Sequence, residues 1–324
     1  MNPFEYYFDQ LSRSDQRFYR EMLGHLSQRS DKFTVSLPAK PDVHRVMEAI
    51  RNDHSELFYL EALGRYTWRE TAGGTVTMEF APDYRFSAAE TRTLERKIRA
   101  EADRVIRAAG RRSPRDTALF FHDWLVRECE YSTRESGQSF THRLDGPFLY
   151  RRCVCEGFAK AFKYLCDSVG IPCMEVTGAA NGGGKNGPHS WNIVRIGSRY
   201  YCVDVTFDNH DTSYEAASFC SRASFLISTQ MMLRNHTPDR EFSLPNCPAE
   251  DSGLMVVRTA AELRSAMKAG PERGGCREIR LAPGVSFDAL RSQASNGLSN
   301  ADISWWNAVK GFTTTSSGNV IIRW

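Results

Sequence analysis

A cysteine, a histidine and an aspartate that could together break an amide bond occur in the order Cys155, His189 and Asp204. Cys155 stands at the predicted start of a helix near Glu156, where unpaired backbone N–H groups and the helix dipole favour a thiolate. A thiolate is the form of cysteine that attacks a carbonyl carbon. We therefore predict that Cys155 is a nucleophile and that a backbone N–H at this helix start stabilises the oxyanion.

A predicted β-hairpin brings His189 and Asp204 together. Two extended runs within residues 190–206 are rich in Trp, Ile, Val and Tyr and flank the two-residue loop Gly197-Ser198. Pairing across this loop makes His189 and Asp204 diagonal neighbours on one face, with Cβ atoms about 7–8 Å apart. A three-residue loop would place them on opposite faces. With the shorter loop, His189 is the predicted base and Asp204 the group that orients its ring.

Residues around this predicted triad are candidates for lining a substrate cleft. Gly157 keeps the first turn of the nucleophile helix slim, so a substrate carbonyl could approach the sulfur. The loop Asn181 to Pro188, which contains Gly187, is polar and rich in glycine, and we expect it to be mobile and to leave the cleft open. Trp191 is expected to shield the site from water.

Four short motifs give the sequence a resemblance to the bacterial transglutaminase-like superfamily. They are Cys155-Glu156-Gly157-Phe158-Ala159, Gly170-Ile171-Pro172, His189-Ser190-Trp191-Asn192 and Val203-Asp204-Val205-Thr206-Phe207-Asp208. The resemblance covers about Ser113 to Phe242. The sequence departs from the family at Phe158 and Phe207, where Tyr and Trp are commoner, and at Ser190, where Ala is commoner. Membership implies a papain-like α+β core, a triad of Cys155, His189 and Asp204, and no cofactor.

Other cysteines and histidines have simpler interpretations. Cys153 could bind a metal with Cys155 and His189, but structural zinc uses C-x2-4-C spacing with a second pair, which the sequence lacks, so we predict no metal. His122 is expected to pack or to lie on a helix surface. For His236 we favour a hydrogen bond within a turn over a place at the cleft border. Nine cysteines in a chain of this length are expected to be mostly reduced thiols.

The flanks of the predicted core are structured segments of different kinds. Residues 1–110 alternate helical and extended patterns, with helices at 14–25, 43–52 and 88–109 and a hairpin across Ala72-Gly73-Gly74. Residues 111–248 form the predicted catalytic core, in which the helix carrying the nucleophile packs on an antiparallel sheet. Residues 249–324 show a strand, helix, strand, helix, strand order that predicts a small α/β domain. The expected fold class is α+β.

Composition limits the partners. Forty-two Lys and Arg against 39 Asp and Glu give a net charge of +3, and the basic residues are scattered, so nucleic acid is not an expected partner. The sequence has no apolar run near the roughly 18 residues of a membrane span. Its first 30 residues do not resemble a signal peptide. Cytoplasmic localisation is the default expectation, although a trimmed leader would leave no trace.

These residues predict a thiol enzyme that attacks a peptide or side-chain amide through a thioester, with a peptide or protein as substrate. Hydrolysis is favoured over amine transfer. A protein that keeps the fold without turnover, as a peptide-binding or assembly module, is the alternative. A redox or metal-binding protein built on the nine cysteines is a third possibility and would contain bound zinc or disulfides.

Overall fold

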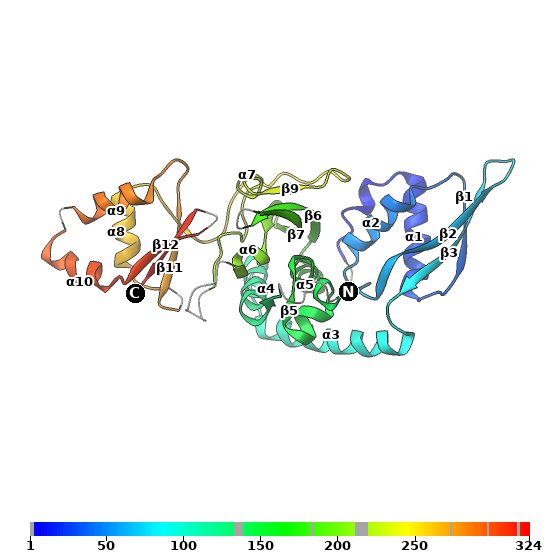
Figure 1. The fold of residues 1–324 in the computed structure, drawn as a ribbon, viewed down its shortest axis with the longest axis horizontal. Helices are drawn as coiled ribbons and strands as arrows, with labels where there is room; N and C mark the ends of the chain where they lie inside the picture. The colour runs from blue at the N-terminus through cyan, green and yellow to red at the C-terminus, as the bar shows by residue number, and fades with distance from the viewer. Residues whose placement is uncertain are drawn as a thin grey trace.

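The three-dimensional structure is a computed structural model of the 324-residue chain. It describes residues 3–132, 139–182, 185–210, 220–272, 274–296, 298–315 and 318–324. The N-terminal elements lie at one end, the core elements in the middle and the C-terminal elements at the other end (Figure 1). Among these residues, no helix is both long enough and apolar enough to cross a membrane.

The N-terminal segment contains a three-stranded antiparallel sheet in the order β1-β3-β2. Its elements are η1 (Phe8–Gln10), α1 (Arg13–Ser27), β1 (Phe33–Leu37), α2 (Val43–Asp53), β2 (Leu60–Glu70), β3 (Val76–Tyr84) and α3 (Ala88–Ala109). The three predicted helices and the predicted hairpin are present. Strand β1 was not predicted. Its alternate residues are buried, a pattern that indicates a strand with one face against a core.

The central segment contains an antiparallel sheet in the order β8-β7-β6-β9, with α5 packed against β6 and β7. Its helices are α4 (Pro114–Glu128), η2 (Ser139–His142), η3 (Gly146–Tyr150), α5 (Cys155–Ser168), α6 (Val205–His210) and α7 (Thr229–Met232). Its strands are β4 (Glu130–Tyr131), β5 (Arg152–Cys153), β6 (Cys173–Gly182), β7 (Lys185–Ile196), β8 (Arg199–Val203) and β9 (His236–Pro238). The mixture of helices with antiparallel sheets confirms the α+β class.

The predicted β7–β8 register is confirmed, because Ile196 pairs with Arg199 across the two-residue loop. Two details of the hairpin differ from the prediction. Strand β8 ends at Val203, so the extended run does not reach Thr206. Asn181 to Pro188 is not a loop throughout, because β6 and β7 continue into it and pair Ala180 with Gly187. Cross-strand hydrogen bonds therefore hold most of this glycine-rich stretch, of which residues 183 and 184 lie outside the described ranges.

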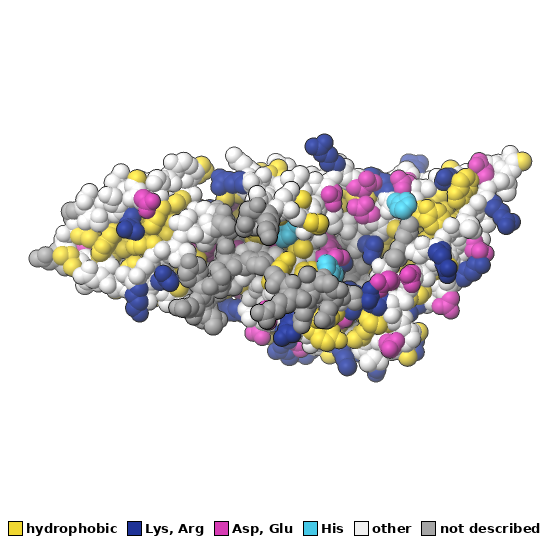
Figure 2. All heavy atoms as spheres, viewed as in Figure 1, with side chains coloured by type: hydrophobic (Ala, Val, Ile, Leu, Met, Phe, Trp, Pro, Cys, Tyr) yellow, Lys and Arg dark blue, Asp and Glu magenta, His cyan; other side chains and the backbone are white. Residues whose placement is uncertain are grey.

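The C-terminal segment forms a four-stranded sheet in the order β10-β11-β13-β12, covered by helices. Its elements are β10 (Met255–Val257), α8 (Ala260–Lys268), β11 (Cys276–Leu281), α9 (Phe287–Ser295), α10 (Asn300–Ala308), β12 (Gly311–Thr314) and β13 (Asn319–Arg323). The predicted order of strands and helices is present, and α10 and β12 add to it. Hydrophobic side chains are visible on this part of the surface (Figure 2).

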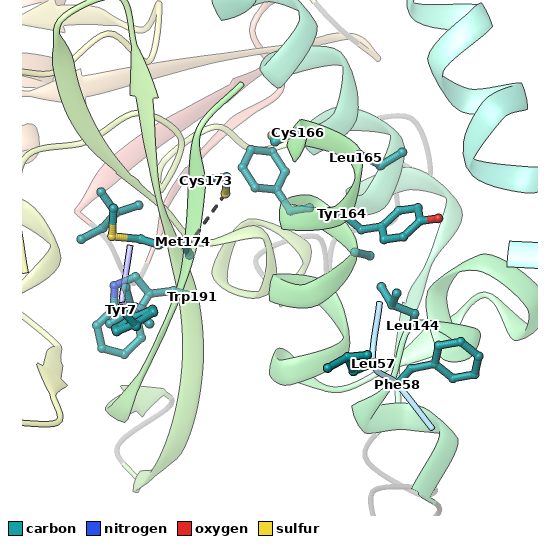
Figure 3. Packing of buried hydrophobic residues seen from close by; sticks show 14 of the residues in the cluster. Tyr7, Leu57, Phe58, Leu144, Tyr164, Leu165, Cys166, Cys173, Met174 and Trp191 are labelled. Carbon is teal, nitrogen blue, oxygen red and sulfur yellow. Dashed lines mark hydrogen bonds between the residues drawn. The ribbon is translucent and has the colours of Figure 1, made fainter. Parts of the chain in front are cut away.

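Two hydrophobic clusters account for most of the buried apolar side chains. The larger cluster runs from Tyr7 to Cys247 and joins the N-terminal segment to the core, and the smaller begins at Val257. Figure 3 shows part of the larger cluster, with Tyr164 on α5 and Trp191 on β7. A separate core supports treating residues 249–324 as a domain. We keep the division into 1–110, 111–248 and 249–324 as a proposal.

Candidate active site

Cys155 is the first residue of α5 and is partly exposed. Strand β5 precedes this helix in the chain. Val154, between the two, donates a backbone hydrogen bond from its N–H to Thr141 O over 3.0 Å. The N-cap residue Val154 makes no side-chain cap, so the N–H groups of the first turn are not bonded by that side chain. A helix start of this kind favours negatively charged groups near its first turn.

His189 on β7 lies between the cysteine and a buried carboxylate. Its Nε2 atom is 2.7 Å from Asp204 Oδ2, and the Cys155 side chain lies close enough to contribute to the raised pKa of His189. The His189 side chain is 9% exposed and Asp204 is 1% exposed. The structure thus brings the three predicted residues together in the order cysteine, histidine, carboxylate, which is the order that proton transfer from a thiol requires.

Asp204 also begins the helix that follows it. Its Oδ1 atom accepts hydrogen bonds from the backbone N–H groups of Thr206, at 2.8 Å, and Phe207, at 3.1 Å. An aspartate that bonds the first N–H groups of a helix acts as an N-cap. This cap explains why the chain leaves β8 at Val203 and turns into α6. The same residue therefore ends the strand, starts the helix and holds the histidine.

The charges in this group are coupled. Burial lowers the pKa of His189, but attraction to Asp204 and hydrogen bonds with Asp204 and Cys155 outweigh it and raise the pKa to about 10. Burial raises the pKa of Asp204, but His189 and a hydrogen bond from His236 outweigh it and hold that pKa well below its usual range. At neutral pH the arrangement favours an imidazolium beside an ionised carboxylate.

Aromatic rings enclose the histidine. Trp191 stacks near His189, with ring centroids 6.1 Å apart and an interplanar angle of 20°. Phe207 meets the same ring edge-on, with centroids 5.4 Å apart. Trp191 is 2% exposed. It was predicted as a shield against water, and its position beside the His189 ring is consistent with that role.

His236 is a member of this group that the sequence did not assign to it. Its Nε2 atom lies 2.8 Å from Asp204 Oδ2, the same oxygen that His189 contacts. We expected a turn hydrogen bond, and the ring does contact its own turn, at Met232 O and Asn235 Oδ1. It reaches the site because β9 pairs with β6. A three-residue strand pairing across the sheet leaves little signal in the sequence.

Gly157 and Gly187, the two predicted cleft glycines, have different surroundings. A Cβ atom on Gly157 would lie 2.5 Å from Thr141 O and 2.6 Å from Cys153 Cβ. Glycine is thus needed there because protein atoms fill the space. Gly187 has open space where a Cβ would stand, so a role for Gly187 in lining a cleft stays a prediction.

Within the described ranges, two groups of His, Asp and Cys residues could hold a metal ion by residue type and spacing. Ligand atoms of His189, Asp204 and His236 lie within 4.8 Å of one another, as do those of His122, Asp123 and Cys220. In the first group, the Nε2 atoms of His189 and His236 each lie at hydrogen-bond distance from Asp204 Oδ2. These hydrogen bonds account for the geometry without an ion. Cys153 belongs to neither group and is buried, and burial raises the pKa of its thiol.

The second group is a buried ion network on the side of α4. His122 Nδ1 lies 3.1 Å from Asp123 Oδ1, and its Nε2 lies 2.9 Å from Asp208 Oδ2. Arg222 Nη2 donates to Asp123 Oδ2 over 2.6 Å, and Cys220 donates to Asp123 Oδ1 over 3.4 Å. His122 is thus completely buried between carboxylates, not a helix-surface residue. The Arg222 guanidinium already neutralises part of the negative charge that would attract a metal ion to this group.

Comparison with known proteins agrees with the motifs. A sequence profile of the transglutaminase-like superfamily matches residues 101–205. Over 131 residues the chain is 30% identical to the kyphoscoliosis peptidase of Homo sapiens and 24% identical to that of Mus musculus. Each match covers 36% of this chain and 20% of the relative. The chain therefore spans about a fifth of the length of these curated relatives.

Solved structures show weaker similarity. A transglutaminase crystal structure aligns with a TM-score of 0.32 and 14% identity, covering 44% of each chain. A proposed cysteine protease from Cytophaga hutchinsonii aligns with a TM-score of 0.30 and 14% identity, covering 64% of this chain and 68% of that one. Similarity this distant says nothing about activity. The profile match and the four motifs agree, and residues 101–205 of this chain are therefore a transglutaminase-like core.

Proposed function

We propose that this chain is a thiol enzyme that acts on peptide or side-chain amides, with Cys155 as nucleophile, His189 as proton carrier and Asp204 as the orienting group. The hydrogen bond between His189 and the buried Asp204, with the partly exposed Cys155 close enough to raise the pKa of His189, carries the proposal. The Cys155 sulfur attacks the amide carbon and the C–N bond breaks as His189 protonates the leaving amine. Water then attacks the thioester and gives a proton to His189, the C–S bond breaks, and a carboxylic acid and the Cys155 thiolate are released beside the protonated His189.

We further propose that hydrolysis is favoured over transfer to an amine. Transfer needs an acyl-enzyme that is shielded from water and a second site that orients the incoming amine. Cys155 is partly exposed at the start of α5, which supports access of water to a thioester formed there. The aromatic residues described above pack against the histidine ring.

Product analysis tests both parts of the proposal. The protein is incubated with glutamine-containing peptides, with and without a labelled primary amine, and the products are identified by mass spectrometry. Cleavage or deamidation that Cys155→Ala abolishes is the expected result. Predominant incorporation of the amine would overturn the preference for hydrolysis. Products unchanged by Cys155→Ala would overturn the assignment of the nucleophile.

A further inference from the structure

The Asp204 carboxylate accepts hydrogen bonds from four donors, two at each oxygen. Oδ1 accepts from two backbone N–H groups of α6, and Oδ2 accepts from the Nε2 atoms of His189 and His236. In a Cys-His-Asp triad only one imidazole needs the carboxylate. The second imidazole therefore requires its own explanation, which rests on the function proposed above.

His236 is held firmly against rotation. Its Nδ1 atom lies 2.7 Å from Asn235 Oδ1 and 3.2 Å from Met232 O, while its Nε2 atom faces the carboxylate. The side chain is 2% exposed. Rings pack on it from two sides, with centroids 5.0 Å away at Trp191 and 4.7 Å away at Phe207. A ring fixed at both nitrogens can hold a hydrogen-bond partner at a fixed angle.

The two histidines share one oxygen and the same aromatic surroundings. Their ring centroids are 5.2 Å apart, and both contact Trp191 and Phe207. When one carboxylate oxygen accepts hydrogen bonds from two N–H groups, it attracts each of them less strongly than it would attract one alone. His236 therefore competes with His189 for Oδ2. Because two backbone donors anchor Oδ1, the carboxylate keeps its place when that competition changes.

We propose that His236 is a second positioning residue of the site, which fixes the Asp204 carboxylate and moderates the basicity of His189. An imidazolium held too strongly by its carboxylate is a poor acid toward the leaving amine. A second donor on the same oxygen weakens that hold and speeds proton donation. Among the described residues, Cys155 and Tyr131 also interact electrostatically with this site, Cys155 with His189 and Tyr131 with Asp204.

The test uses variants that separate the donor from the volume of the ring. His236→Gln keeps an N–H that can reach Oδ2, whereas His236→Phe fills the space with no donor. His44→Gln, on the exposed face of α2, is the matched control. The pH dependence of Cys155 alkylation is measured for each protein, because it needs no substrate, together with kcat and KM on a cleaved peptide and the melting temperature.

For His236→Phe, the alkaline limb of Cys155 alkylation should move up by roughly half to one pH unit, since Oδ2 then serves His189 alone. The kcat of His236→Phe should fall about tenfold with little change in KM. His236→Gln should restore most of the wild-type kcat and most of the wild-type position of the alkaline limb. An unmoved alkaline limb in His236→Phe, with or without a lower melting temperature, would overturn the inference and leave His236 a packing residue. A wild-type protein whose Cys155 is unreactive would overturn the proposed function instead.

Discussion

Two histidine–carboxylate groups in this protein have nearly the same composition and different surroundings. In both, hydrogen bonds to carboxylates raise the pKa of a histidine against the effect of burial. Carboxylates face both nitrogens of His122, and its side chain is 0% exposed. A carboxylate faces one nitrogen of His189, and the partly exposed Cys155 lies close enough to raise the pKa of that ring.

The difference teaches that a shifted pKa does not by itself identify a catalytic histidine. Structural ion networks shift pKa values as strongly as active sites do. Catalysis also requires a ring nitrogen that faces the reacting atom and access for a substrate. In the group around His189 the ring lies beside Cys155, which is partly exposed, whereas both nitrogens of His122 face carboxylates and its side chain is 0% exposed. Paired substitutions at equivalent members of the two groups can break or sharpen this comparison.

The largest difference is expected between the two cysteines. Cys155→Ala removes the proposed nucleophile, and peptide turnover should fall by about 10³-fold or more. Cys220→Ala removes a weak donor to Asp123, so turnover should stay within about twofold while the free energy of unfolding falls by roughly 1 kcal/mol. Peptide kinetics and urea denaturation measure the two effects. Equal loss of turnover in the two variants would erase the distinction between the groups.

Substitution of the two carboxylates, Asp204 and Asp208, should likewise affect turnover at one and stability at the other. Asp204→Asn keeps an oxygen for the α6 cap but weakens the hold on His189, so kcat should fall by about 10²- to 10⁴-fold. Asp208→Asn should change kcat less than about fivefold and should lower the free energy of unfolding by roughly 2 kcal/mol, because His122 keeps Asp123. Steady-state kinetics on folded protein, checked by circular dichroism, is the measurement. A kcat for Asp204→Asn near the wild-type value would show that Asp204 has no orienting role.

For stability the order should reverse. His122→Gln leaves the buried Asp208 without its cationic partner and leaves Asp123 with its arginine partners alone, so unfolding should become easier by about 3–5 kcal/mol. His189→Gln should cost roughly 1 kcal/mol, since Asp204 keeps His236 and two backbone donors. Urea denaturation of both variants at pH 7 compares these costs. A larger cost at His189 than at His122 would mean that the ring near the thiol has the greater structural role.

Stability should also depend on pH through His189. The pKa of His189 is raised in the folded state, so its stabilising contribution is complete below its unfolded pKa of about 6.5 and is lost as pH rises through about 10. The unfolding free energies of wild type and His189→Gln should therefore converge between pH 7 and 10. A constant difference over that range would contradict the raised pKa.

Much of this arrangement could be predicted from local sequence. The start of α4 was predictable from Ser113 and Pro114, and the β7–β8 register from Gly197-Ser198. Asp204 as a helix cap was harder to predict, because Val203 to Phe207 has the apolar, β-branched composition of a strand and the cap acts only once the side chain is buried.

His236 could not be assigned because its place depends on a non-local pairing. The strand that carries it has only three residues and pairs with β6 more than fifty residues earlier. Sequence patterns report the periodicity of one element and seldom the partner of a short one. The network of His122 was missed for a related reason, since its partner Asp208 is 86 positions away along the chain.

Selective alkylation tests the central claim most directly. Brief treatment with iodoacetamide at about pH 6–7, followed by peptide mapping, compares all nine cysteines in one experiment. Cys155 should be labelled first, because it is partly exposed at a helix start beside His189, while the other eight cysteines are buried. His189→Gln should slow that labelling. Labelling of Cys153, or of any other cysteine, ahead of Cys155 would contradict the account.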